Sequence, residues 1–253
     1  MIVGVTSWRG IGATTTALGL AASVVARGHR PWLVEADPAG GVLAARLPRG
    51  VAAAGALEHV AFPDRRSSAL ERFHDAAVDV AGIRIVTAPG DPFRAWACHA
   101  PRMPWAPSLR ELDGPVFVDL GRARGGAPVT PVLDQLDLVL VVADADAVSV
   151  ATTMEWAESM GRVAAVDTAL PVDRVSCAVV DAPTALDRVG RIDALTELGD
   201  RYAGWLPWDP DGVRALHDLV PFDDRRLRRA AIVQALHHLV GEIARRTGSE
   251  VAA

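Results

Sequence analysis

Apolar residues along this chain form short, nearly continuous runs that alternate with longer stretches of helical periodicity. Several runs are apolar throughout, as expected for strands covered on both faces of a parallel sheet. The runs predict strands at Ile2–Thr6, Pro31–Glu35, Ile83–Thr87, Val116–Asp119, Leu138–Val142, Val175–Val180 and Tyr202–Leu206. The stretches between them predict helices at Ala13–Arg27, Ser67–Val80, Ala147–Val163, Thr184–Leu198, Val213–Leu219 and Asp224–Arg246.

This alternation of strand and helix predicts a three-layer, doubly wound α/β fold with a mostly parallel sheet. No internal repeat or clear domain boundary interrupts it, so we expect a single domain over residues 1–246. Residues Thr247–Ala253 are expected to form a flexible tail. Ligands of such folds bind beyond the carboxyl ends of the strands, so candidate site residues belong there.

Pro89–Pro107 is an irregular stretch within this pattern. It contains five prolines and two tryptophans, so it cannot form one regular helix. One interpretation is a surface loop packed on the domain. The other is a lid or a surface for a partner, because exposed tryptophan is favoured at interfaces.

The composition of the chain limits the classes of protein to which it can belong. Apolar residues make up 50% and charged residues 23% of the 253-residue chain, as in ordinary soluble domains. The net charge of −5 argues against a surface that coats nucleic acid generally. Two cysteines without a Cys-x-x-Cys motif indicate a reducing compartment, and the scattered histidines predict no tightly bound metal. We see no leader sequence and no membrane-spanning run, so we expect a cytoplasmic protein.

A glycine-rich loop follows the first strand, at Ser7–Thr16, and leads into an Ala/Leu-rich helix. Its frame is that of G-x-x-x-x-G-K-[ST], with Ser7 at the first glycine and Ala13 at the lysine. Gly10 and Gly12 allow the backbone to wrap around an anion at a helix N-terminus. The alternative is a glycine-rich turn that binds nothing.

The loop has no lysine, and neither does the rest of the chain: all 26 basic residues are arginine. A P-loop lysine places a positive charge on the terminal phosphates, so its absence removes charge from the cradle. Compositional bias of a GC-rich genome explains the missing lysines by drift. Selection against the reactive cation is the other explanation.

Two aspartates fall at the carboxyl ends of predicted strands beside this loop. Asp37 follows the second strand, and Asp119 ends the fourth. In a nucleotide site, one such aspartate positions the attacking water and the other orders Mg²⁺. Each could instead be a helix cap or turn residue. Three elements in the right order, each at a strand end, favour the nucleotide site.

With these motifs the chain resembles the MinD/ParA group of deviant P-loop ATPases. The matching stretches are SWRGIGATTTALGLAA, LVEADPAGG, VFVDLG, LDLVLVVADADAVSV and GWLPWDPDGVRAL, which follow the family order over most of the chain. The resemblance implies a P-loop NTPase fold, a homodimer, and ATP with Mg²⁺ as the ligand. It implies phosphate contacts from Arg9, Gly10, Ile11, Gly12, Ala13, Thr14 and Thr15, and base contacts near Asp181, Pro207, Trp208 and Asp209. Thr14 and Asp119 would then serve Mg²⁺, and Asp37 would position water.

The chain departs from active members of that family at the charged positions of the loop. Trp8 stands at the signature lysine, Ala13 at the P-loop lysine, and Arg9 at a usual glycine. Losing two charge-assisted hydrogen bonds of about 1.5–3 kcal/mol each weakens phosphate binding by roughly 10²–10⁴ if the losses add. Arg9, Arg122 or Arg124 could return some of this charge.

We therefore expect weak nucleotide binding and very slow or absent hydrolysis. Degenerate loops of this kind also resemble the TadZ/CpaE branch, whose members act as localisation or assembly factors for pili and secretion machines. A membrane-associated protein machine is then a candidate partner. The alternative is an active ATPase of the ParA/MinD type, with arginine in place of the lysines and DNA partition as a function.

The last predicted helix carries a basic patch and an apolar stripe. The basic patch is Arg225, Arg226, Arg228 and Arg229, which is either a solvated face or a contact for DNA, acidic lipid or an acidic protein. The apolar stripe is Ile232, Val233, Leu236, Leu239, Val240 and Ile243. We expect the apolar stripe to pack on the sheet, although MinD-like relatives use a C-terminal amphipathic helix on membranes.

Overall fold

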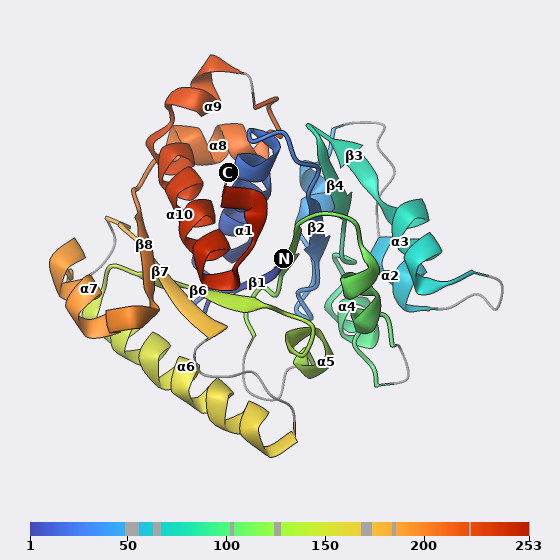
Figure 1. The fold of residues 1–253 in the computed structure, drawn as a ribbon, viewed down its shortest axis with the longest axis horizontal. Helices are drawn as coiled ribbons and strands as arrows, with labels where there is room; N and C mark the ends of the chain where they lie inside the picture. Colours follow the sequence, from blue (N-terminus) through green and yellow to red (C-terminus); the bar gives the residue numbers. More distant parts are fainter. Residues whose placement is uncertain are drawn as a thin grey trace.

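The computed structural model describes residues 1–48, 56–62, 67–101, 104–123, 128–167, 174–183, 186–222 and 224–252. They form an eight-stranded sheet in the order β3-β4-β2-β5-β1-β6-β7-β8, flanked by helices on both faces (Figure 1). The strands are β1 (Ile2–Thr6), β2 (Trp32–Glu35), β3 (Val78–Val80), β4 (Ile83–Val86), β5 (Val116–Asp119), β6 (Leu138–Asp144), β7 (Val175–Val180) and β8 (Tyr202–Leu206). All neighbouring strands pair in parallel except β3, which runs antiparallel to β4. This confirms the predicted three-layer α/β fold.

Helices and turns connect these strands. The α-helices are α1 (Ala13–Val25), α2 (Ala56–Ala61), α3 (Ala69–Ala76), α4 (Pro92–Ala97), α5 (Thr130–Leu133), α6 (Ala147–Asp167), α7 (Arg191–Leu198), α8 (Pro210–His217), α9 (Arg225–Arg229) and α10 (Ala231–Thr247). Short 3₁₀ turns occur at η1 (Leu43–Arg46), η2 (Ala106–Glu111), η4 (Gly199–Arg201) and η5 (Glu250–Ala252).

Two apolar cores lie on the two faces of the sheet. On one face α1, α8 and α10 pack over β1 and its neighbours, and Gly19 of α1 allows Leu236 of α10 to approach closely. On the other face, α2, α3, α5, α6 and α7 contribute to the second core (Figure 1). Strand β1 is buried along its whole length because it is central and covered on both sides.

The register of the central strands brings the predicted site residues to one edge. Val5 of β1 pairs with Asp119 of β5, and Glu35 of β2 pairs with Asp119 on the other side. The carboxyl ends of β1, β2 and β5 are therefore level, and the loop that follows β1 begins beside Asp119.

Most predicted helices differ from the observed ones by a few residues at their ends, and three of the differences are of structural interest. The helix predicted at Ser67–Val80 ends at Ala76, because β-branched Val78 and Val80 form β3 as an edge strand. The helix predicted at Thr184–Leu198 begins only at Arg191 in the described residues. The helix predicted at Asp224–Arg246 is divided at Ala230, whose ψ of 129° is extended.

Parts of the irregular stretch and of the C-terminal segment pack on the domain. Within Pro89–Pro107, Asp91 caps the short helix α4 and Trp105 is 2% exposed, whereas Trp96 is 52% exposed. In the segment expected to be a flexible tail, Val251 is 7% exposed and its carbonyl accepts a hydrogen bond from Arg27. The apolar stripe of α10 is buried throughout, as predicted.

Candidate functional site: a loop between a helix N-terminus and buried carboxylates

The loop after β1 has the backbone of an anion cradle. Gly10 and Gly12 have φ of 78° and 73°, in the left-handed region that favours glycine, and Gly12 is the N-cap of α1. The Ser7 hydroxyl accepts the Ile11 N–H at 2.9 Å and holds the loop closed at its base. The first N–H groups of α1 are thus presented at its positive end.

Asp119 lies at the base of this loop and is completely buried. Its Oδ1 accepts the Gly121 N–H at 3.0 Å, while Oδ2 has no hydrogen-bond partner among the described residues. Burial raises the pKa of Asp119 to about 7, although the Thr14 hydroxyl and the Gly121 N–H both favour its ionised form. Thr14 and Asp119, predicted as the Mg²⁺ pair, therefore face one another.

Asp37 approaches the same point from β2. Gly121 has a φ of 55°, and a β-carbon at this position would lie 2.0 Å from the Asp37 carboxyl carbon. The Asp37 carboxyl group therefore packs directly against the Gly121 backbone. Burial raises the pKa of Asp37, and the Ala39 N–H and the charge of Arg122 oppose that rise. Asp37, Asp119 and residues 7–15 thus form one group, which we call the phosphate side.

This arrangement fits a magnesium ion. Mg²⁺ is usually held by one or two carboxylates and hydroxyls, with water and substrate phosphates completing six positions. A fully buried carboxylate oxygen without a partner needs an explanation, and a bound cation with its water supplies one. In the described ranges no cluster of three or more histidine, cysteine or acidic side chains could hold a metal without a phosphate ligand.

Two of the four residues predicted to flank a nucleotide base are engaged in bonds within the protein. We call Asp181, Pro207, Trp208 and Asp209 the base side. Asp181 forms a salt bridge with Arg188. Asp209 caps α8 by accepting the Gly212 N–H at 2.9 Å, and its other oxygen accepts the Ile232 N–H of α10 at 3.2 Å. Trp208 is 55% exposed. Asp209 therefore orders two helices, which is a structural role.

No protein-family model and no curated protein matches the sequence. Among solved structures, the ParA family ATPase from Chlorobium tepidum TLS matches with a TM-score of 0.70 at 15% identity, covering 94% of this chain and 96% of that one. The MinD cell division ATPase from Pyrococcus furiosus matches with a TM-score of 0.70 at 13% identity, covering 96% and 98%. MinD from Pyrococcus horikoshii OT3, solved with Mg-ADP, matches with a TM-score of 0.66 at 13% identity, covering 96% and 94%.

The chain has the fold of the ParA and MinD ATPases. The structure shows where four residues of the loop, Trp8, Arg9, Ala13 and Thr15, are placed. Trp8 is half-buried and packs against one of the two cores, and Ala13 is buried in the other. Arg9 extends toward the β6 end, where its guanidinium lies 3.9 Å from Asp146 Oδ1. Thr15 hydrogen-bonds His217 of α8 at 2.8 Å.

Sequence reasoning did not single out two polar residues beside this site. Glu35 is 1% exposed and accepts N–H groups from Val42, Leu43 and Ala88, so it organises the loop that follows Asp37. The sequence signal that could have indicated Glu35 is a charged residue at the end of an otherwise apolar strand. The second is His217, which lies 202 residues along the chain from its partner Thr15, so no local sequence pattern could indicate that pair.

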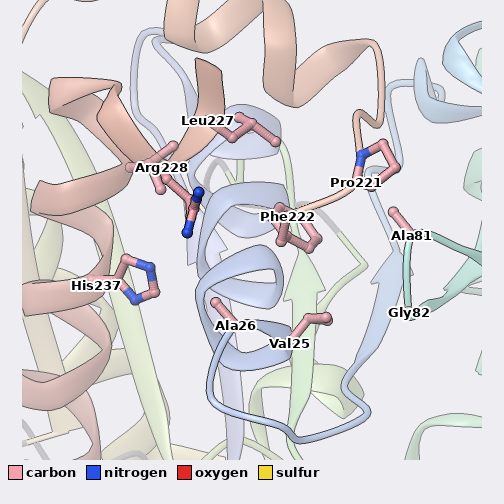
Figure 2. Close-up of a pocket in the computed structure, with 10 residues that line it drawn as sticks. Val25, Ala26, Ala81, Gly82, Pro221, Phe222, Leu227, Arg228 and His237 are labelled. Carbon is pink, nitrogen blue, oxygen red and sulfur yellow. The ribbon is translucent and has the colours of Figure 1, made fainter. Parts of the chain in front are cut away.

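The basic patch lies on α9, away from the phosphate side. All four arginines are exposed, and Arg226 forms a salt bridge with Asp224 at 3.2 Å. Arg228 also lines a pocket of about 710 Å³ at the C-terminal end of α1. Figure 2 shows Arg228 and His237 on one side of the pocket and Pro221, Ala81 and Gly82 on the other. No helix in the described ranges is long and apolar enough to cross a membrane.

Proposed function

We propose that this chain binds ATP with Mg²⁺ through the phosphate side and hydrolyses it very slowly or not at all. The observation that carries the proposal is the meeting of Gly12, Thr14, Asp37 and Asp119 at the N-terminus of α1, in a chain without lysine. A preorganised cradle binds phosphate without lysine because backbone N–H groups and the helix dipole remain.

Thr14 and Asp119 are the residues that would hold Mg²⁺. When bound, the ion would neutralise part of the phosphate charge that a lysine meets in other P-loop proteins. The solved MinD from Pyrococcus horikoshii carries Mg-ADP on the same fold, which supports this choice of ligand. The engagement of Asp181 and Asp209 in structural bonds supports weak selection for the base.

The slow hydrolysis follows from the missing cations. A finger-type cation that stabilises the transition state contributes about 10³–10⁵ in rate. Trp8 and Ala13 leave two such positions uncharged. Asp37 remains in place to position water, so a low residual rate is expected from it alone.

In the cell we propose a role as a cytoplasmic positioning or assembly factor that acts as a homodimer through its loop face. Trp8 supports this because it is half-buried at the loop, where an apolar ring contributes to contact with a second copy or a partner. A pilus or secretion machine is the class of partner that the resemblance of the loop suggests.

A second candidate is an active ATPase in which an arginine replaces the lysines. The position of Arg122 against Gly10 favours it, because a guanidinium is the other side chain suited to phosphate. Turnover separates the two candidates. If Arg122→Ala lowers ATP turnover by about 10³-fold or more, an arginine supplies the missing cation and the active enzyme is established. A slow turnover that Arg122→Ala leaves unchanged removes the active enzyme.

Titration calorimetry of the purified protein with ATP and Mg²⁺ tests the binding itself. We expect binding that requires Mg²⁺ and is weakened by Thr14→Ala. Ala13→Lys is expected to tighten it by about 10-fold or more, because one charge-assisted hydrogen bond returns. Ala13→Met, which matches the length of lysine without its charge, is the control. Absence of heat with the parent chain and with Ala13→Lys would overturn the proposal.

A further inference from the structure

We propose that Arg122 supplies the positive charge of the phosphate side and contacts the terminal phosphates of a nucleotide held by the loop. This inference rests on the proposed nucleotide binding and names the side chain that takes over from the absent lysine. The charge would come from the segment after β5, not from the loop itself.

The backbone around Arg122 is fixed to the end of β1. The Gly121 carbonyl accepts the Ser7 N–H at 3.0 Å and the Thr6 hydroxyl at 3.1 Å. The Thr6 hydroxyl oxygen accepts the Ala123 N–H at 3.0 Å. Residues 121 and 123 are both buried, so the residue between them has a defined position beside the loop.

The side chain of Arg122 is exposed and lies against Gly10. A β-carbon on Gly10 would stand 2.2 Å from Arg122 Nε and 2.4 Å from its Nη2, so the guanidinium occupies the space where a side chain at position 10 would lie. A glycine at this position therefore has two roles. It provides the left-handed turn, with φ of 78°, and it leaves room for a cation against the loop backbone.

The Arg122 guanidinium lies within electrostatic reach of Asp37 but, in the described residues, is not held in a salt bridge. Its charge opposes the rise that burial causes in the pKa of Asp37, which places the two groups within this reach. In the described part of the chain, however, Arg122 forms no salt bridge. An exposed guanidinium beside a cradle of N–H groups can turn to a phosphate, whose oxygens fit its planar fork in a bidentate manner.

Arg9, the other described arginine at the loop, is less suited to this role, because its guanidinium is directed to Asp146. Arg124 lies outside the described residues. The structure thus distinguishes Arg122 from Arg9, which the sequence left equivalent.

Titration calorimetry with ATP, ADP and AMP in the presence of Mg²⁺ tests the proposal. Arg122→Ala is expected to weaken ATP binding by about 10- to 100-fold and to leave AMP binding unchanged, since a single charge-assisted contact to the distal phosphates is lost. Arg122→Lys should recover part of the affinity. Arg225→Ala, which removes the same charge from an exposed arginine on α9, away from the phosphate side, is the matched control and should change ATP affinity less than about threefold. Thermal unfolding of each variant without nucleotide verifies that the fold is kept.

The outcomes separate this inference from the function on which it rests. If the parent chain binds no nucleotide, both are overturned. If the parent binds ATP and Arg122→Ala binds it equally well, only the role of Arg122 is lost. Tighter ATP binding by Arg122→Ala would also overturn the role of Arg122, because the guanidinium would then obstruct access of the phosphates to the loop. Equal weakening of ATP and AMP binding contradicts a contact to the distal phosphates.

Discussion

The phosphate side and the base side use their polar groups in opposite ways. On the base side, Asp209 accepts two backbone N–H groups and Asp181 is paired with Arg188. On the phosphate side, Asp119 Oδ2 is completely buried and has no partner among the described residues. His99, whose imidazole bonds the backbone of Ala36 just before Asp37, also keeps an unpartnered Nε2.

This difference indicates where a ligand would gain binding energy. Buried polar atoms without partners destabilise the free protein, and a ligand that satisfies them recovers that free energy. Polar groups that already have hydrogen-bond partners within the protein would gain little free energy from binding a ligand. We therefore expect recognition of polyphosphate with magnesium, and little discrimination between bases.

The largest expected effect is at Asp119. Asp119→Asn removes a buried charge that has no counter-ion while keeping the shape of the side chain, so the free energy of unfolding without ligand should rise by about 3 kcal/mol. The same change should abolish the thermal stabilisation that ATP with Mg²⁺ gives the parent. Urea unfolding and thermal melts measure the two effects.

The matched control is Asp144→Asn, at the carboxyl end of β6, which lies two strands away from β5 in the sheet. Its carboxyl is only half-buried, so both effects should be small. A loss of ligand-free stability in Asp119→Asn would contradict the idea that this carboxylate is retained for a ligand.

The next effect is a pH dependence that originates at His99. Burial lowers its pKa to about 4 from an ordinary value of 6.5. The unfolded chain therefore binds the proton first, and the stability that His99 contributes is complete above pH 6.5 and is lost as the pH falls toward 4. Between pH 7 and 4 this loss amounts to about 2–3 kcal/mol.

His99→Phe is the variant that isolates this effect. Phenylalanine keeps a ring against Trp105, whose centroid lies 5.8 Å away, but it cannot take up a proton. Urea unfolding at pH 7 and at pH 4.5 should show a smaller difference in the variant than in the parent. Equal differences in the two proteins would place the acid sensitivity elsewhere.

The sequence predicted that Thr14, Asp37 and Asp119 lie close together, because these residues follow parallel strands. Strand periodicity fixed the ends of β1, β2 and β5, and parallel pairing then brings Thr14, Asp37 and Asp119 together. The turn of Arg122 toward Gly10 could not be predicted, because a long flexible side chain has no periodic signal. The break at Ala230 was missed for a related reason. The cap of α10 comes from distant Asp209, whereas the local sequence favours one continuous helix.

A smaller effect on stability is expected at that distant cap. Asp209→Ala removes one hydrogen bond from the first turn of α8 and another from α10, and should lower the free energy of unfolding by about 2 kcal/mol. ATP affinity should change little, because the carboxylate faces helices and not a base. Asp211→Ala, two residues away with a side chain 92% exposed, is the control for urea unfolding and should have almost no effect.

The smallest effect is expected at Asp181, and it bears most directly on base recognition. Its carboxylate is engaged by Arg188, so Asp181→Ala should change the ratio of ATP to GTP affinity by less than about twofold. Arg188→Ala frees the same carboxylate and serves as the opposing variant. If the base side has kept a latent preference, the ratio should change in Arg188→Ala and be restored when Asp181→Ala is added. A change of more than fivefold in Asp181→Ala alone would break the comparison, because the pair would then be part of the nucleotide site and not a structural bond.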